Sequence, residues 1–137
     1  MTWPEPLRAE ARNINQQRYI VLLITGEGQH VGNVLCTIDR RTRCGTMHEL
    51  TLTDDGGAPR QRLRGLVLMV REAFRHAADA GITRGSTDAP EQMREFAARM
   101  LGFEGRPRGD RTRFSGDVAT MRSHILGVTD GDGNFSR

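Results

Sequence analysis

The sequence predicts a mixed α/β (α+β) domain with one central sheet and two principal helices. Three strand-like runs of apolar and β-branched residues, at 19–25, 30–38 and 47–53, are separated by segments rich in turn-forming residues. The period then changes from strand-like to helical over residues 63–81, and a second, shorter helical pattern covers residues 91–103. A chain of 137 residues fits a single hydrophobic core.

The first half of the chain predicts a three-stranded antiparallel meander. Tyr19–Thr25 is apolar and β-branched, and Gly26-Glu27-Gly28 provides a turn into a second strand at His30–Ile38. A third strand follows at Met47–Thr53. Two sets of residues alternate in it, as they would on the two faces of a sheet: His48, Leu50 and Leu52 against Glu49, Thr51 and Thr53.

A long amphipathic helix is predicted over Leu63–Gly81, with the final glycine as its C-cap. Its apolar face consists of residues at helical spacing: Leu66, Val67, Val70, Phe74, Ala77 and Ala78. The polar loop Asp54–Pro59 precedes it. A strand that enters a helix through such a loop directs backbone N–H groups and the positive end of the helix dipole at one place, which favours phosphate. Arg60, Arg62 and Arg64 would surround that place, and the alternative is that these arginines are simply solvated.

The second half predicts a short strand, a second helix and a hairpin. Ile82–Ser86 has the composition of the strand. Asp88-Ala89-Pro90-Glu91 is typical of a helix start, with an acid at the N-cap, a proline in the first turn and a glutamate three residues after the cap. The helix would end at Gly102, and Phe103–Arg106 with Arg111–Phe114 would form the hairpin.

The end of the chain predicts an extension beyond the domain. Its helical signal is a loose spacing of three apolar residues: Val118, Met121 and Ile125. The segment 127–137 has too little apolar surface to fold alone. We therefore divide the chain into a domain at 1–117, with its core from about residue 19, and an interaction tail at 118–137. We expect Val118–Arg137, anchored by Phe135, to dock on other protein subunits of an assembly.

The composition permits anionic partners and disfavours several other classes. All 20 basic residues are arginine, which pairs bidentately with phosphate or carboxylate, and the formal net charge is +3. Nucleic acid is disfavoured because basic and aromatic residues do not interleave. Cys36 and Cys44 have no zinc-ligand spacing, so we expect reduced thiols and no metal.

No membrane partner is expected. The longest apolar run, Tyr19–Ile24, is too short to span a bilayer, and the N-terminus lacks the pattern of a signal peptide. These features predict a protein that is cytoplasmic or is packaged into a particle from inside a cell.

The element order strand-strand-strand-helix-strand-helix-strand-strand resembles that of the GCN5-related N-acetyltransferase (GNAT) superfamily. The likeness covers about Tyr19 to Asp117. Met47–Thr53 resembles the fourth strand of the family, and Glu91–Phe103 resembles its helix that ends in Gly-Phe. Arg62-Leu63-Arg64-Gly65-Leu66-Val67 resembles its pyrophosphate loop, R-x-x-G-x-G/A. The resemblance implies a GNAT-like central mixed sheet.

The resemblance also implies acetyl-coenzyme A as the cofactor, in a V-shaped opening between the strands at 47–53 and 82–87. Its pantetheine would pair with the backbone of Thr51, Leu52 and Thr53. Its pyrophosphate would take N–H groups of Arg62, Leu63, Arg64, Gly65 and Leu66. Transfer of an acetyl group to an amine needs a base, and Glu49, acting through a water, is the expected one, with His48 as the second catalytic candidate. The alternation of a strand predicts that only one of these two faces the opening.

Several positions depart from the family pattern. Val67 occupies the position of the second glycine or alanine, Ala98 that of a common tyrosine, and Glu91 that of a usual asparagine. Residues 1–18, with one short helix expected around Leu7–Arg12, replace the two N-terminal helices of the family, so the N-terminus is truncated.

Three functions are considered, two from this resemblance and its departures and the third from the net positive charge. The first is a protein with a degenerate acetyl-coenzyme A site that serves as a structural or binding component of a larger assembly such as a phage virion. The chain also resembles, in pattern and size, GNAT-like virion proteins of short-tailed phages. The alternative is an active acetyl-coenzyme A-dependent N-acetyltransferase of unknown amine acceptor. The third is a nucleic-acid-binding accessory protein.

Overall fold

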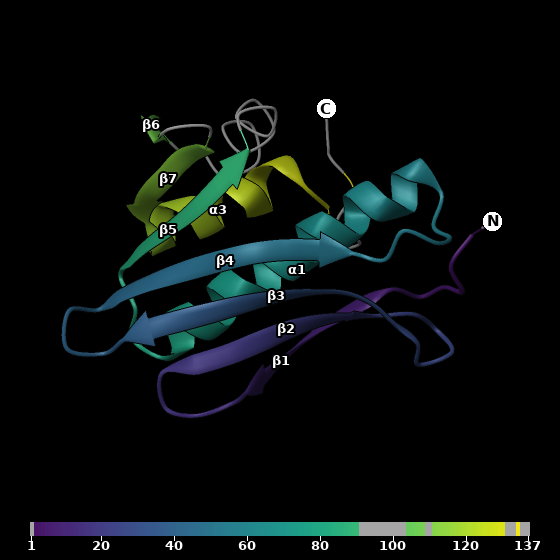
Figure 1. Cartoon of the computed structure of the whole chain (residues 1–137), viewed down its shortest axis with the longest axis horizontal. Helices are drawn as coiled ribbons and strands as arrows, with labels where there is room; N and C mark the ends of the chain where they lie inside the picture. The colour runs from purple at the N-terminus through teal and green to yellow at the C-terminus, as the bar shows by residue number, and fades with distance from the viewer. Residues whose placement is uncertain (1, 91–103, 109–110, 131–133, 135–137) are drawn as a thin grey trace.

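The computed structural model describes residues 2–90, 104–108, 111–130 and 134. This part of the chain forms one mixed sheet of seven strands in the order β1-β2-β3-β4-β5-β7-β6. Helices α1 and α3 contribute their buried residues to the same core cluster, on one face of the sheet (Figure 1). The predicted mixed α/β architecture with one central sheet is confirmed.

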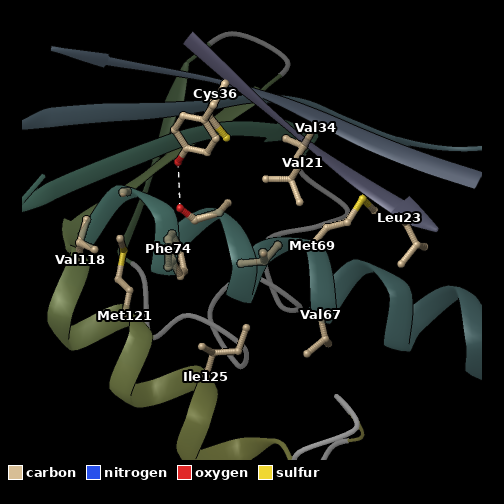
Figure 2. Packing of buried hydrophobic residues seen from close by; sticks show 14 of the residues in the cluster. Val21, Leu23, Val34, Cys36, Val67, Met69, Phe74, Val118, Met121 and Ile125 are labelled. Carbon is tan, nitrogen blue, oxygen red and sulfur yellow. Dashed lines mark hydrogen bonds between the residues drawn. The ribbon is translucent and has the colours of Figure 1, made fainter. Parts of the chain in front are cut away.

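Four antiparallel strands form the first half of the sheet: β1 (Arg8–Asn13), β2 (Arg18–Ile24), β3 (His30–Asp39) and β4 (Cys44–Leu52). Each pairs with the next in chain order, which confirms the predicted meander and adds β1 at its edge. Alternate residues of the strands face the helices, and Val21, Leu23, Val34 and Cys36 lie in the core (Figure 2).

The segment before β2 is a strand, so the short helix expected around Leu7–Arg12 is wrong. In β1, Ala9 and Ala11 pack against the core, and they alternate with Glu10 and Arg12, which form an ion pair at 3.2 Å. This period of two matches a strand. Pairing with the apolar strand β2 also satisfies backbone groups that a short polar helix would leave to solvent.

Helix α1 spans Pro59–Asp79 and begins one turn before the predicted start at Leu63. Proline is well tolerated at the first helical position because that N–H has no intrahelical partner. The Gln61 side chain accepts a hydrogen bond from the Ala58 N–H at 3.1 Å and so caps the helix start. Most of the predicted apolar face is buried in the core between the sheet and α3, and Leu66 and Ala78 are partly buried. The buried residues are Val67, Val70, Phe74 and Ala77.

Strand β5 (Arg84–Pro90) lies parallel to β4, as predicted, but starts and ends later than expected. Asp88, Ala89 and Pro90 belong to this strand, so the predicted helix start there is wrong. The reason is tertiary: β7 pairs with β5 along its whole length, out to Pro90 opposite Arg111. That ladder outweighs the local capping signal. The predicted helix over 91–103 lies outside the described residues.

The predicted hairpin near the end of the domain is confirmed. Its strands are β6 (Glu104–Arg108) and β7 (Arg111–Asp117), which pair antiparallel. Pro107 and Arg108, expected in the turn, belong to β6.

Helix α3 (Val118–Val128) follows β7 directly, and the Asp117 carboxylate caps it by accepting a bond from the Thr120 N–H at 2.9 Å. This bond holds the pKa of Asp117 below its usual value. Val118, Met121 and Ile125 are buried in the same core as α1 (Figure 2). The predicted boundary at residue 117 therefore falls inside the folded unit, and Val118–Val128 has its contacts within the chain.

The two thiols occupy different environments. Cys36 is buried, and burial raises its pKa to about 12, which makes it an inert core residue. Cys44 is exposed, and both cysteines are free, as predicted. Next to Cys36, the Tyr19 hydroxyl donates to the Ala73 carbonyl at 2.8 Å, and burial raises the pKa of Tyr19 well above its usual value. Within the described part of the chain, no helix is long and apolar enough to cross a membrane.

Candidate functional site

Strands β4 and β5 pair over a short stretch and then separate. The parallel ladder joins Cys44–Met47 to Arg84–Thr87 and ends there. Both strands continue, β4 to Leu52 and β5 to Pro90, and Figure 1 shows them diverging. The two strands therefore diverge, as a V-shaped opening between them requires, and the diverging segments are 48–52 and 88–90.

A β-bulge in β4 lies where the opening begins. Opposite β3, Met47 pairs with Cys36 and Leu50 pairs with Val34, so His48 and Glu49 together face the single residue Leu35. Such a bulge breaks the alternation of side chains. Met47 and Leu50 both pack on the core, whereas His48 and Glu49 are both exposed. The prediction of opposite facings for His48 and Glu49 is therefore wrong.

The two exposed residues of the bulge differ in their contacts. The His48 Nε2 atom lies 2.9 Å from the Thr37 hydroxyl of β3, on the face of the sheet opposite the helices. The Glu49 carboxylate forms no hydrogen bond or ion pair within the described part of the chain. Glu49 is thus available to accept a proton, and His48 is held by its neighbour.

The backbone N–H and C=O groups of successive β4 residues point alternately toward β3 and toward the gap between β4 and β5. The Thr53 N–H donates to the Val31 carbonyl at 2.8 Å, so Thr53 points toward β3. In an antiparallel ladder the next residue but one points the same way, and the residues between point away. Thr51 therefore also faces β3, while the backbone groups of Leu50 and Leu52 face the opening. Of the three predicted pantetheine contacts, Leu52 has the required orientation.

The loop between β4 and α1 supplies free N–H groups at the end of the opening. Gly56 and Gly57 both have positive φ angles, 78° and 77°, which favour glycine. Their N–H groups and that of Arg60 have no hydrogen-bond acceptor among the described residues. Three N–H groups near the positive end of α1 form a suitable place for an anion.

The residues predicted to bind pyrophosphate lie inside the helix instead. The Arg62 N–H donates to the Ala58 carbonyl at 2.9 Å, and Leu63 to Leu66 follow within α1. Gly65 faces the core, where an added Cβ would lie 2.4 Å from Leu23 Cδ2. Its absence of a side chain permits close packing of helix on sheet. Val67, which occupies the position of the second glycine or alanine of the pattern, is fully buried. The R-x-x-G-x-G/A likeness is therefore a packing pattern here.

The arginine side chains of the first helical turns are largely engaged. Arg62 Nη1 donates to the carbonyls of Thr53 at 2.7 Å and Gly56 at 3.1 Å, which fixes the loop. Arg64 forms an ion pair with Glu5. Arg60 is exposed and makes neither kind of contact within the described residues. Of the three predicted phosphate ligands, Arg60 is the one with a free guanidinium.

An N-terminal strap, residues 2–7, holds this loop from behind. Trp3 is 5% exposed, so the core begins well before residue 19. The Gln61 side chain accepts from the Trp3 N–H at 2.8 Å and donates to the Trp3 carbonyl at 2.9 Å. The Trp3 indole lies against the glycine pair, where a Cβ on Gly57 would be 2.7 Å from the ring. Arg62 Cζ lies 5.6 Å from the centre of that ring. The sequence signal for this strap was a lone tryptophan in a polar segment.

A coenzyme fits one part of this site and not another. The backbone groups of Leu50 and Leu52 and the N–H groups of Gly56, Gly57 and Arg60 match the amides and pyrophosphate of coenzyme A. The guanidinium groups of Arg62 and Arg64 do not, because the loop and Glu5 already occupy them. Among the described residues, no group of three or more His, Cys, Asp and Glu side chains is placed to hold a metal ion.

No family model matches the sequence, and no curated protein does. Solved structures do match the fold. A putative acyl-CoA N-acyltransferase from Klebsiella pneumoniae has a TM-score of 0.59 at 12% identity, over 75% of this chain and 74% of that one. GCN5 from Tetrahymena has a TM-score of 0.57 at 10% identity, over 76% and 70%.

A third similar structure, a spermidine N-acetyltransferase from Vibrio cholerae in complex with CoA and spermine, has a TM-score of 0.60 at 11% identity, over 81% of this chain and 69% of that one. Identities this low show the fold and no more. Two features of the sheet agree with these structural similarities: β4 separates from β5 after four paired residues, and a bulge in β4 lies beside that point. The chain has the GNAT fold.

Proposed function

We propose that this chain binds an acyl-coenzyme A in the opening between β4 and β5 and transfers the acyl group to an amine. The observation that carries the proposal is the separation of β4 from β5 immediately after Met47 and Thr87, beside the bulge that exposes Glu49. Similar structures of this fold are acetyltransferases, and one contains CoA.

The walls of the opening would hold the coenzyme through the main chain. The N–H and C=O groups of Leu50 and Leu52 would pair with the amides of pantetheine, as a further strand pairs with a free strand edge. The N–H groups of Gly56 and Gly57 and the Arg60 guanidinium would hold the pyrophosphate. The bound coenzyme supplies the acyl thioester.

Glu49 would remove the proton of the attacking amine, directly or through one water. Its carboxylate is exposed, has no hydrogen bond or ion pair to another described residue, and is located on the bulge where β4 and β5 begin to diverge. His48 lies beside it, and its contact with Thr37 orients the imidazole. His48 is the second candidate for the same proton transfer.

Titration of the full chain with acetyl-coenzyme A tests the proposal. We expect saturable binding with a Kd of about 10 μM, and backbone amide shifts in NMR spectra at Leu50, Leu52, Gly56 and Gly57. Arg60→Gln should weaken binding by about 2- to 5-fold, because it removes one exposed charge contact. Arg8→Gln, at an exposed arginine of β1, is the matched control and should leave the Kd unchanged.

Two results would overturn the proposal. One is the absence of saturable binding up to about 1 mM acetyl-coenzyme A. The other is binding whose amide shifts lie away from β4 and its following loop. Release of free thiol in the presence of amines is the readout for transfer itself.

A second candidate function, a binding component of a larger assembly without catalysis, has one specific observation in its favour. Arg62, Arg64 and Gly65, which resemble the family's pyrophosphate loop, serve to fix the loop, the strap and the helix packing. Failure of the coenzyme titration would favour this function. A place in a phage particle stays a prediction.

A further inference from the structure

A groove of about 730 Å³ crosses the face of the sheet opposite the helices. It lies between the β1–β2 turn and the β3–β4 turn, at the other end of β4 from the proposed coenzyme loop. Its floor is a row of directly paired residues, Arg18 of β2, Thr37 of β3 and Thr46 of β4. Their neighbours Tyr19, Cys36 and Ile38 face the core, so the row points away from the helices.

The side chains that line this groove carry a net positive charge, because three arginines outnumber one acidic residue. Arg18, Arg40 and Arg41 line it, with Asp39 as the one acidic residue among its lining residues. Asp39 is already used, because its Oδ1 accepts from the N–H groups of Arg41 at 2.9 Å and Thr42 at 3.3 Å in the turn. The three guanidinium groups form no ion pair or hydrogen bond within the described residues.

Arg60 is likewise without an ion pair among the described residues, but three other arginines do form one. Arg12, Arg64 and Arg75 each form an ion pair with a nearby carboxylate. The groove therefore gathers three guanidinium groups around a single carboxylate, Asp39, whose Oδ1 already accepts two hydrogen bonds in the turn. Guanidinium groups bind carboxylate and phosphate through paired hydrogen bonds, and hydroxyls beside them add further donors. Thr37, Thr42 and Thr46 supply hydroxyls. Two of them also have a protein partner, since Thr37 Oγ1 lies 2.9 Å from His48 Nε2 and Thr46 Oγ1 lies 3.3 Å from Ser86 Oγ.

We propose that this groove binds the carboxylate or phosphate group of a small molecule. Its volume is that of a small-molecule site. The lining contains no aromatic side chain, so the stacking that single-stranded nucleic acid needs is absent from it.

The groove connects to the bulge through one contact. Thr37, on its floor, lies 2.9 Å from His48, the neighbour of Glu49. On the basis of the proposed function, we take the ligand to be the acyl acceptor, an amine that also carries an acidic group. The arginines of the groove bind the acidic group, and the amine points toward Glu49. A polyamine would meet three like charges and is disfavoured.

NMR titration of the full chain with inorganic phosphate, and separately with succinate, tests the site without coenzyme. The amides of Gln17, Thr37 and Thr46 should shift saturably, and the tighter of the two anions identifies the preferred acidic group. Arg18→Gln with Arg41→Gln should weaken that binding at least about 10-fold. Arg8→Gln with Arg122→Gln removes the same two charges from exposed positions outside the groove, so it should change the Kd less than about 2-fold.

Equal weakening by the two double variants, or shifts spread over arginines elsewhere, would overturn the site, because general charge attraction then explains the binding. Thiol release from acetyl-coenzyme A tests the acceptor role separately. Phosphoethanolamine should exceed spermidine in kcat/KM at least about 10-fold. The reverse order of kcat/KM overturns the acceptor role alone. Absence of coenzyme binding overturns the proposed function, and in that case the anion titration still shows whether the groove binds an acidic group.

Discussion

Glu49 is the residue on which the proposed chemistry depends most. Glu49→Gln keeps the size and exposure of the side chain but removes the proton acceptor. We expect turnover to fall by at least about 100-fold, the usual contribution of a general base. The Kd of acetyl-coenzyme A should stay within about 2-fold, because Glu49 has no part in the proposed coenzyme contacts.

The matched control for this substitution is His48→Gln, which retains a polar partner for Thr37. It should reduce turnover less than Glu49→Gln does. A larger loss in the His48 variant would transfer the role of base from Glu49 to His48. Thermal unfolding of both variants should match that of the parent chain, since both side chains are exposed.

His76 makes the stability of the domain depend on pH. Burial, and then the neighbouring Arg75, lower its pKa below the usual value. Its ring lies 4.3 Å from that of Tyr19, and its Nε2 lies 2.9 Å from Asn13 Oδ1. Because the folded pKa is lowered, the unfolded chain binds the proton more readily, and protonation favours unfolding.

The free energy of unfolding should therefore fall as pH decreases through about 6.5, the pKa of an unperturbed histidine, and level off below the lowered pKa of the folded state. Urea unfolding at pH 7.5 and at pH 5.5 measures the difference. His76→Gln should reduce this difference, because the variant has no group to titrate there. An unchanged difference in the variant would assign the pH dependence to other histidines.

At the scale of elements, the strap and the glycine loop form one unit. Gly57 and Gly28 both have positive φ angles, 77° and 83°, so alanine at either position strains the backbone by about 1 kcal/mol. Nothing lies within 4 Å of a Cβ on Gly28, whereas a Cβ on Gly57 would be 2.7 Å from the Trp3 ring. Gly57→Ala should therefore cost about 1–3 kcal/mol more than Gly28→Ala in urea unfolding.

A second comparison attributes that extra cost to the strap. In a Trp3→Leu background the smaller side chain leaves room for the added methyl group, so the difference between the two alanine variants should shrink. Equal costs of the two substitutions in the parent chain would mean that Trp3 does not support the loop. The same variants, titrated with acetyl-coenzyme A, show whether the loop must be held for binding.

The elements with a clear hydrophobic period could be predicted from the sequence, and their ends could not. The meander and the buried face of α1 follow from alternation and from the spacing of Val67, Val70 and Phe74. Helix α1 begins at Pro59, earlier than predicted, because the Gln61 side chain accepts a hydrogen bond from the Ala58 N–H and caps the helix. Hydrophobic periodicity does not encode such a contact between a side chain and a loop. The end of β5 depends on pairing with β7, which is a tertiary contact.

The candidate site was harder to predict than the fold because it depends on a β-bulge and on glycines, which the hydrophobic periodicity of strands and helices does not reveal. The bulge at His48 and Glu49 adds one residue to a strand whose sequence looks continuous. Gly65 matched a phosphate-binding pattern, yet a glycine at a helix–sheet contact has the same sequence signature. The adjacent Gly56 and Gly57 were the better signal for free N–H groups.

At the scale of the whole molecule, both described ends of the chain return to α1. The strap contacts its first turn through Gln61. After α3, the buried Thr129 donates its hydroxyl to the Ile125 carbonyl, and Arg71 of α1 donates to the Asp130 carbonyl at 2.9 Å. The folded unit thus extends at least to Asp130, well beyond the boundary expected at residue 117.

These contacts change what truncation should do. Ending the chain after Leu126 removes Thr129 and Asp130, so we expect it to lower the free energy of unfolding by about 1–2 kcal/mol. Ending it after Asp130 keeps both contacts and, among the described residues, removes the exposed hydrogen bonds between Asp130 and Asn134, so the free energy of unfolding should change by less than about 0.5 kcal/mol. Docking of the remaining residues, with Phe135, on another subunit stays a prediction, and only the second truncation tests it without disturbing the fold. Equal stability of the two truncated chains would mean that Thr129 and Asp130 do not secure α3. Loss of stability in the chain that ends after Asp130 would mean that the last seven residues, 131–137, contribute to the stability of the domain itself.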